Sequence, residues 1–165
     1  MKNLELKVKV PSLDIVKQSL AFAEFIENLH QKDTYYLIGR KRLKLREQKG
    51  VGELIYYVRE NKGNSKESKY FRFNILPGLL PFTKILLGFF FGQKRIVEKE
   101  RYLYLYRHTR IHLDNVKNLG EFLELETVAY DNIPENLLLE EHEEVKRKLK
   151  LEPEQYISNS YSDLL

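Results

Sequence analysis

Apolar and polar residues alternate along much of this chain, and the alternation predicts β-strands. In residues 3–10 every second side chain is apolar, so Leu4, Leu6 and Val8 would lie on one face of a strand. Similar alternation, or a concentration of branched and aromatic residues, recurs in later segments. The predicted strands are residues 3–10, 34–38, 42–47, 54–59, 69–74, 96–106, 110–116 and 122–130. Eight strands with few helices between them favour an antiparallel sheet, and about eight are enough to close a barrel.

Three other segments have apolar residues at helical spacing. They are residues 12–30, 79–91 and 134–149, which would cover the outer face of the sheet. Residues 61–67 are rich in Asn, Gly, Ser and Lys and predict a loop. The most apolar stretch, residues 85–91, is much shorter than the ~20 residues of a membrane span. We interpret it as a buried helix or an interaction surface, and its exposure would indicate a homodimer contact.

Length and composition limit the function. The 165 residues predict one domain, 1–165, with a C-terminal helix and tail from about residue 134, since no linker or repeat divides the chain. The absence of cysteine excludes a thiolate zinc site and a thiol nucleophile. The first ten residues lack the apolar core of a signal peptide, and we expect a cytoplasmic protein. A net charge of +4 is too small to demand nucleic acid, and we expect neither a nucleic-acid nor a membrane partner.

Charged residues of both signs fall on the strand faces opposite the apolar ones. Residues two apart on a strand point the same way, as Glu124 and Glu126 do. The acidic members of this set are Glu5, Asp114, Glu124 and Glu126, and the basic members are Lys7, Lys44, Arg46, Arg59, Lys99, Arg101 and Arg110.

Such a mixture has two explanations. Basic side chains that face one another repel unless an anion lies between them, and the guanidinium fork of arginine suits phosphate. Carboxylates beside a phosphate in turn need a divalent cation such as Mg²⁺. The mixture therefore indicates a site for polyphosphate and metal, provided that these faces turn inward. The alternative is a half-exposed sheet whose charges lie in water and whose apolar face packs on helices.

Several sequence blocks resemble those of a known family. Asn3-Leu4-Glu5-Leu6-Lys7 is similar to the family's N-terminal Glu-x-Glu-x-Lys strand. The other similar blocks, in matching order, are residues 31–36, 43–47, 54–59, 97–101, 109–114, 119–126 and 160–165. In their order and spacing they resemble the CYTH, or triphosphate tunnel, superfamily, and within it the class IV adenylyl cyclase-like branch.

The resemblance implies a mainly β, α+β fold, a closed eight-stranded antiparallel barrel with helices packed outside. Members bind a triphosphate inside this tunnel together with Mg²⁺ or Mn²⁺. Carried over by position, the metal ligands would be Glu5, Glu124 and Glu126, with Asp114 a ligand or its support. Phosphate would be held by Lys7, Lys44, Arg46, Arg59, Lys99, Arg101 and Arg110, of which Lys7, Arg59 and Arg101 would be catalytic. Asn3 departs from the motif, because it stands where the first glutamate would be and brings no charge.

The resemblance favours an adenylyl cyclase-like enzyme, which would convert ATP to cyclic AMP and pyrophosphate. The same tunnel can serve a triphosphatase acting on thiamine triphosphate or tripolyphosphate, because phosphoryl chemistry depends mostly on positioning and charge stabilisation. A module that holds nucleotide or polyphosphate without turnover is a further alternative, motivated by Asn3. An RNA-binding surface fits less well, because carboxylates accompany the basic residues. We expect His112 to form hydrogen bonds rather than to act as a base.

Overall fold

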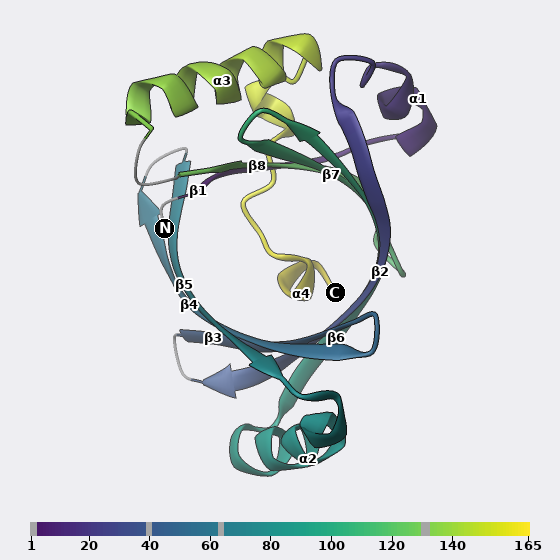
Figure 1. The fold of residues 1–165 in the computed structure, drawn as a ribbon, viewed down its shortest axis with the longest axis vertical. Coiled ribbons are helices and arrows are strands. Elements are labelled where there is room, and N and C mark those ends of the chain that lie inside the picture. Colours follow the sequence, from purple (N-terminus) through teal and green to yellow (C-terminus); the bar gives the residue numbers. More distant parts are fainter. Residues whose placement is uncertain (1–2, 39–40, 63–64, 130–132) are drawn as a thin grey trace.

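Eight strands and four α-helices make up the described part of the chain (Figure 1). The computed structural model describes residues 3–38, 41–62, 65–129 and 133–165, and their side chains except at 41, 57–62 and 65–70. The strands are β1 (Asn3–Lys9), β2 (Glu24–Ile38), β3 (Lys41–Gln48), β4 (Val51–Lys62), β5 (Ser65–Ile75), β6 (Gln93–Tyr106), β7 (Thr109–Val116) and β8 (Gly120–Val128). The helices are α1 (Leu13–Gln18), α2 (Leu80–Phe91), α3 (Glu135–Lys148) and α4 (Tyr161–Leu164), with short 3-10 helices η1 (Pro77–Leu79) and η2 (Pro153–Gln155).

The eight strands form one antiparallel sheet in the order β1-β8-β7-β6-β2-β3-β4-β5. The sheet curls until its edge strands β1 and β5 approach each other, and in Figure 1 the ribbon runs round a ring. Within the described residues no strand pairing joins β1 to β5. The predicted mainly β fold with an eight-stranded antiparallel sheet is therefore confirmed. Closure of the barrel is not, because this last ladder of hydrogen bonds is missing.

Two sequence predictions about these elements are wrong. The helix expected over residues 12–30 ends with α1 at Gln18, and β2 begins at Glu24. Along β2 the register with β6 shifts between Phe25 and Glu27, so Ile26 is an extra residue that interrupts the two-residue period. This bulge made the apolar residues around it fall at helical spacing. The loop expected over residues 61–67 is also wrong, because β4 runs to Lys62 and β5 begins at Ser65.

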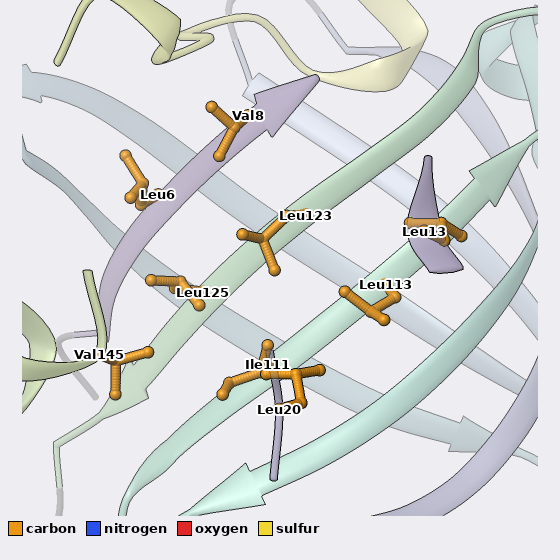
Figure 2. Packing of buried hydrophobic residues seen from close by; sticks show 9 residues of the cluster. All are labelled: Leu6, Val8, Leu13, Leu20, Ile111, Leu113, Leu123, Leu125 and Val145. Carbon is orange, nitrogen blue, oxygen red and sulfur yellow. The ribbon is translucent and has the colours of Figure 1, made fainter. Parts of the chain in front are cut away.

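The main hydrophobic core lies on the outside of the curled sheet (Figure 2). It joins the outer faces of β1, β7 and β8 to α1, the turn after α1, and α3. Its buried members are Leu6, Val8, Leu13, Leu20, Ile111, Leu113, Leu123, Leu125 and Val145. Burying a large apolar side chain contributes about 1.5–3 kcal/mol. Because this packing stabilises the sheet from outside, the inner face is left free to carry polar residues.

Candidate functional site

A polar cavity of about 300 Å³ lies inside the curled sheet, and all eight strands and the C-terminal tail contribute to its wall. Among the described side chains, seven basic residues line it: Lys7, Lys44, Arg46, Arg72, Lys99, Arg101 and Arg110. Four acidic residues also line it: Glu5, Asp33, Glu124 and Glu126. A surplus of positive charge in an enclosed space favours a polyanionic ligand.

Most of the residues predicted for the site lie on this wall, namely Glu5, Lys7, Lys44, Arg46, Lys99, Arg101, Arg110, Glu124 and Glu126. Asp114 is fully buried and contacts Lys99 and Arg101. The side chain of Arg59 lies outside the described residues, although its backbone belongs to β4. The charged faces therefore turn inward, and the half-exposed sheet considered as an alternative is wrong.

Strand alternation explains why the charges gather inside. In the register of β1 and β8, Glu5 lies opposite Glu126 and Lys7 lies opposite Glu124. The intervening Leu6 and its neighbour across the ladder, Leu125, belong to the outer core. Because successive side chains point to opposite faces, the same burial that places the leucines outside places the carboxylates inside.

Lys99, Arg101 and Asp114 form a buried cluster that we call the β6/β7 triad. Arg101 donates from Nε and Nη2 to the two oxygens of Asp114, each at 2.6 Å. The Nζ of Lys99 and the hydroxyl of Tyr161 donate to Asp114 Oδ2, both at 2.9 Å. Arg101 Nη2 also lies 3.3 Å from Glu124 Oε2. Protein donors thus occupy both oxygens of Asp114, which suits a supporting residue better than a metal ligand.

Asp33, Lys44 and Arg46 form an equivalent cluster that we call the β2/β3 triad. Arg46 donates from Nε at 2.8 Å and from Nη2 at 2.7 Å to the two oxygens of Asp33. Lys44 Nζ donates to Asp33 Oδ2 at 3.1 Å. Sequence analysis did not assign Asp33 to the site. The available signal was its place two residues before Tyr35, which puts both side chains on the same strand face and on the cavity wall. The predicted strand began only at residue 34 and so left Asp33 out.

Burial and neighbouring charges shift the pKa values of both triads. Burial alone would raise the pKa of Asp33, but Arg46 and Lys44 outweigh it and hold that pKa well below its usual range. Arg101 and Lys99 likewise hold the pKa of Asp114 low against the effect of burial. Burial, with Arg101 beside it, lowers the pKa of Lys99 to about 7 despite the attraction of Asp114. Near neutral pH a single proton on Lys99 is therefore easily gained or lost.

On the side of the cavity where the carboxylates lie, one side-chain oxygen has no hydrogen-bond partner in the described structure. Asn3 Nδ2 donates to Glu126 Oε1 at 2.7 Å, while Asn3 Oδ1 is buried without a hydrogen-bond partner in the described structure. A free amide oxygen beside carboxylates fits a hard divalent cation such as Mg²⁺ or Mn²⁺. No group of three or more His, Cys, Asp or Glu residues converges as a ready-made metal site in the described part of the chain. Mg²⁺ is commonly held by one or two carboxylates together with substrate phosphates, so the donor set still fits.

His112 lies next to these carboxylates but forms no short contact with them. It is buried, and its Nδ1 lies 3.9 Å from Glu124 Oε1, beyond hydrogen-bond distance. Burial, reinforced by the positive charge of Arg101, lowers the pKa of His112. The hydrogen-bonding role expected of His112 therefore stays a prediction.

The C-terminal tail reaches into the ring, and in Figure 1 α4 lies within it. The backbone N–H of Ile157 donates to the carbonyl of Lys7 at 2.8 Å, and the Lys7 ammonium lies 4.0 Å from the centre of the Tyr161 ring. Arg42 donates to both carboxylate oxygens of Asp163, at 3.1 and 2.8 Å. The tail thereby places Tyr161 against Asp114, a role that the sequence analysis did not assign to residues 160–165.

Comparison with known families agrees with this architecture. A sequence model of the CYTH domain matches residues 1–161. The chain belongs to the CYTH domain family. No curated protein matches this CYTH chain.

Three of the solved structures with a similar fold come from two archaea and a bacterium. The PH1012 protein of Pyrococcus horikoshii OT3 is 25% identical, covers 100% of this chain and 99% of its own, and superposes with a TM-score of 0.83. A conserved hypothetical protein of Pyrococcus furiosus is 21% identical, with 99% of both chains covered and a TM-score of 0.84. A protein named "putative adenylate cyclase" from Vibrio parahaemolyticus is 20% identical, covers 99% of this CYTH chain and 97% of its own, and gives a TM-score of 0.76. The last two show a shared fold.

Proposed function

We propose that this CYTH protein is a divalent-metal-dependent enzyme that acts on a triphosphate held in the cavity. The observation that carries the proposal is the coexistence, on one enclosed wall, of seven basic side chains with carboxylates and an unsatisfied amide oxygen. A polyphosphate would neutralise the surplus positive charge, and a divalent cation would allow the carboxylates to lie beside it. Membership of the CYTH domain family supports the same assignment.

The basic residues supply a clamp for the phosphates. Arg46 and Arg101 present guanidinium groups from opposite sides of β2, and Lys44 and Lys99 accompany them. Lys7 and Arg110 line the same cavity from β1 and β7. The role of Arg59 in holding phosphate stays a prediction. Phosphoryl transfer depends chiefly on orientation and on compensation of negative charge, which fixed basic groups of this kind provide.

The carboxylates and Asn3 would hold the cations. Glu5, Glu124 and Glu126 line the cavity, and Asn3 Oδ1 lies buried beside Glu126. A bound Mg²⁺ or Mn²⁺ would polarise the phosphoryl oxygens and favour an ionised attacking oxygen. Asp114 would act through Lys99 and Arg101, because its oxygens already accept their hydrogen bonds.

Within this class we propose an adenylyl cyclase-like reaction. The 3′-hydroxyl of ATP would attack the α-phosphorus, the bond to the bridging oxygen would break, and pyrophosphate would leave. In a triphosphatase, water would instead attack the terminal phosphorus, the bond to its bridging oxygen would break, the diphosphate would leave, and the attacked phosphorus would be released as inorganic phosphate. The name of the structurally similar protein from Vibrio parahaemolyticus supports the cyclase hypothesis.

A product assay tests the proposal and separates these reactions. The protein is supplied in turn with ATP, thiamine triphosphate and tripolyphosphate, with Mg²⁺ or Mn²⁺, beside Glu126→Gln and a matched control, Glu98→Gln, at an exposed ion pair with Lys117. We expect cyclic AMP and pyrophosphate from ATP, loss of turnover in Glu126→Gln, and wild-type turnover in Glu98→Gln. Phosphate release would identify a hydrolase. Absence of product from all three compounds would overturn the enzyme assignment, and metal-dependent binding without turnover would favour the binding module that Asn3 first suggested.

A further inference from the structure

Exposed apolar side chains cover α2, which projects from the ring on the side opposite α3 (Figure 1). Phe89 is 82% exposed and no residue of α2 is buried, so the buried helix considered for residues 85–91 is wrong. A homodimer contact there stays a prediction. Among the described residues, no helix has the length and apolar content needed to cross a membrane. The charges that extend the cavity lie elsewhere, between β3 and the C-terminal tail.

Arg42 continues the row of cavity cations on β3, although sequence analysis did not assign it to the site. Arg42, Lys44 and Arg46, which we call the β3 row, are two residues apart, so their side chains share the inner face. A strand rises about 3.4 Å per residue, which places Arg42 about 7 Å beyond Lys44 along β3. Its Nη1 donates to Ser160 Oγ at 2.9 Å, and Ser160 lines the cavity. Arg42 therefore lies just behind the cavity wall, at the end of the row nearest the tail.

A carboxylate of the tail binds Arg42 in the way that a phosphate would. Arg42 donates from Nη1 and Nη2 to the two oxygens of Asp163 at 3.1 and 2.8 Å, the bidentate geometry that arginine also uses for phosphate. Ser160 Oγ donates to Asp163 Oδ2 at 2.7 Å, and Lys94 Nζ lies 3.6 Å from Oδ1. Burial alone would raise the pKa of Asp163, but hydrogen bonds from Arg42 and Ser160 outweigh it and hold that pKa well below its usual range. At neutral pH the β3 row therefore ends at an anion supplied by the protein itself.

The tail is anchored inside the ring by contacts other than this ion pair. Tyr161 is buried, its ring packs edge-on against Phe122 with the centroids 5.0 Å apart, and its hydroxyl donates to Asp114 at 2.9 Å. The side chains of Arg42 and Asp163 are instead 26% and 22% exposed, and partly exposed ion pairs contribute little to stability. We therefore expect the tail to stay in place when the charge of Asp163 is removed.

We propose that Asp163 sets the length of the polyphosphate chain that the cavity accepts. The inference rests on the proposed function, because it assumes that the β3 row binds phosphates. With Arg42 held by Asp163, the row offers Lys44 and Arg46 to a triphosphate whose terminal phosphate points toward the tail. A fourth phosphate would meet the carboxylate of Asp163, and repulsion between like charges rejects it. Asp163 thus selects triphosphates over longer chains, and its removal makes Arg42 available to a fourth phosphate.

Calorimetric titration of the full chain with tripolyphosphate and with linear tetrapolyphosphate, each with Mg²⁺, tests the proposal. The variants are Asp163→Asn, the double variant Arg42→Ala/Asp163→Asn, and the matched control Asp14→Asn at an exposed ion pair with Lys17. We expect the wild type and Asp14→Asn to bind tripolyphosphate more tightly than tetrapolyphosphate. Asp163→Asn should bind tetrapolyphosphate about tenfold more tightly than the wild type, with little change for tripolyphosphate, and the double variant should lose this gain. Circular dichroism checks that each variant keeps the fold.

Four results would overturn the proposal. They are equal wild-type affinity for the two polyphosphates, an unchanged ratio of these affinities in Asp163→Asn, an equal gain for both ligands in Asp163→Asn, and a gain that persists in Arg42→Ala/Asp163→Asn. An equal gain would assign Asp163 to the overall charge of the cavity rather than to chain length. Absence of wild-type binding to tripolyphosphate would remove the proposed function as well, whereas wild-type binding with an unchanged ratio would refute this inference alone.

Discussion

The same arrangement of aspartate, lysine and arginine occurs twice on the inner face of the sheet. In the β2/β3 triad Asp33 lies directly opposite Arg46 in the strand register, and in the β6/β7 triad Asp114 lies directly opposite Arg101. Each arginine donates from Nε and Nη2 to the two oxygens of its aspartate. Each triad also has a lysine two residues before the arginine, so alternation along one strand supplies both cations.

The two triads differ in burial and in their outside partners. The side chains of Lys99 and Arg101 are 3% and 8% exposed, whereas those of Lys44 and Arg46 are each 14% exposed. The β6/β7 triad also receives the hydroxyl of Tyr161 and approaches Glu124. We infer that the β6/β7 triad holds the cavity wall and the neighbouring carboxylates in place. The side chains of the β2/β3 triad are freer to turn their hydrogen-bond donors toward a ligand.

Replacing the aspartate of each triad with asparagine should give the largest difference between the triads, measured as the loss of free energy of unfolding. Asp114→Asn leaves Lys99 without its carboxylate partner and Arg101 with only the 3.3 Å contact to Glu124, and breaking a buried ion pair costs roughly 3–5 kcal/mol. Asp33→Asn should cost less, because water reaches Lys44 and Arg46 more easily. Urea unfolding at pH 7 of the wild type and both variants measures the difference. An equal or larger loss for Asp33→Asn would contradict the assignment of the structural role to the β6/β7 triad.

Arginine and glutamate substitutions should have different metal dependences. Arg46→Ala and Arg101→Ala each remove a phosphate contact worth roughly 1.5–3 kcal/mol, so triphosphate affinity should fall by about tenfold to a hundredfold. Glu126→Gln removes a metal ligand, and excess Mn²⁺ should restore part of its activity by mass action. The measurement is the activity of the three variants as the Mn²⁺ concentration is raised. Equal rescue of Glu126→Gln and Arg101→Ala would show that these roles are not separate.

The pH dependence of binding should report on Lys99. With a pKa of about 7 in the free protein, Lys99 is charged below pH 7 and loses its proton above it. A bound triphosphate raises that pKa, so binding above pH 7 takes up a proton and affinity falls by up to about tenfold per pH unit. Lys99→Arg stays charged and should bind with a flatter profile between pH 7 and 9 than the wild type. The exposed control Lys117→Arg should keep the wild-type slope, and a Lys99→Arg profile as steep as the wild type would refute this assignment.

The smallest expected effect concerns the tail. Tyr161→Phe removes one hydrogen bond to Asp114 and should lower the free energy of unfolding by about 1–2 kcal/mol. The β2/β3 triad has no equivalent tail contact among the hydrogen bonds of the described residues, so the loss is specific to the β6/β7 triad. A double-mutant cycle by urea unfolding checks this, because the effect of Tyr161→Phe should shrink when Asp114 is already asparagine. An undiminished effect in that background would show that Tyr161 stabilises the fold by packing alone.

Alternation made most of the site predictable. Glu124 with Glu126, and Lys99 with Arg101, are two apart on regular strands, so the residues that share a face could be read from the chain. This face turns inward because Leu6 and Leu125 are buried on the outside, where α1 and α3 pack against the sheet. The sequence favoured this arrangement but left the half-exposed sheet as an alternative.

Two parts of the structure depend on tertiary context. The bulge at Ile26 interrupts the period of β2 and gave its first half the appearance of a helix. The predicted strand then began at residue 34, one residue after Asp33. Tyr161 reaches Asp114 only because the tail folds back along β1, through Ile157 and Lys7, and because Arg42 holds Asp163. No local pattern encodes contacts between residues so distant in the chain.

Calorimetric titration with tripolyphosphate in the presence of Mg²⁺ tests the central claim most directly, namely that the paired basic residues inside the sheet bind a triphosphate. The comparison uses the wild type, Arg46→Ala and the control Glu98→Gln, whose carboxylate pairs with Lys117 away from the cavity. The account predicts one site per chain in the wild type and in Glu98→Gln, with at least about tenfold weaker binding in Arg46→Ala. Absence of wild-type binding, or equal affinity in Arg46→Ala, would contradict it.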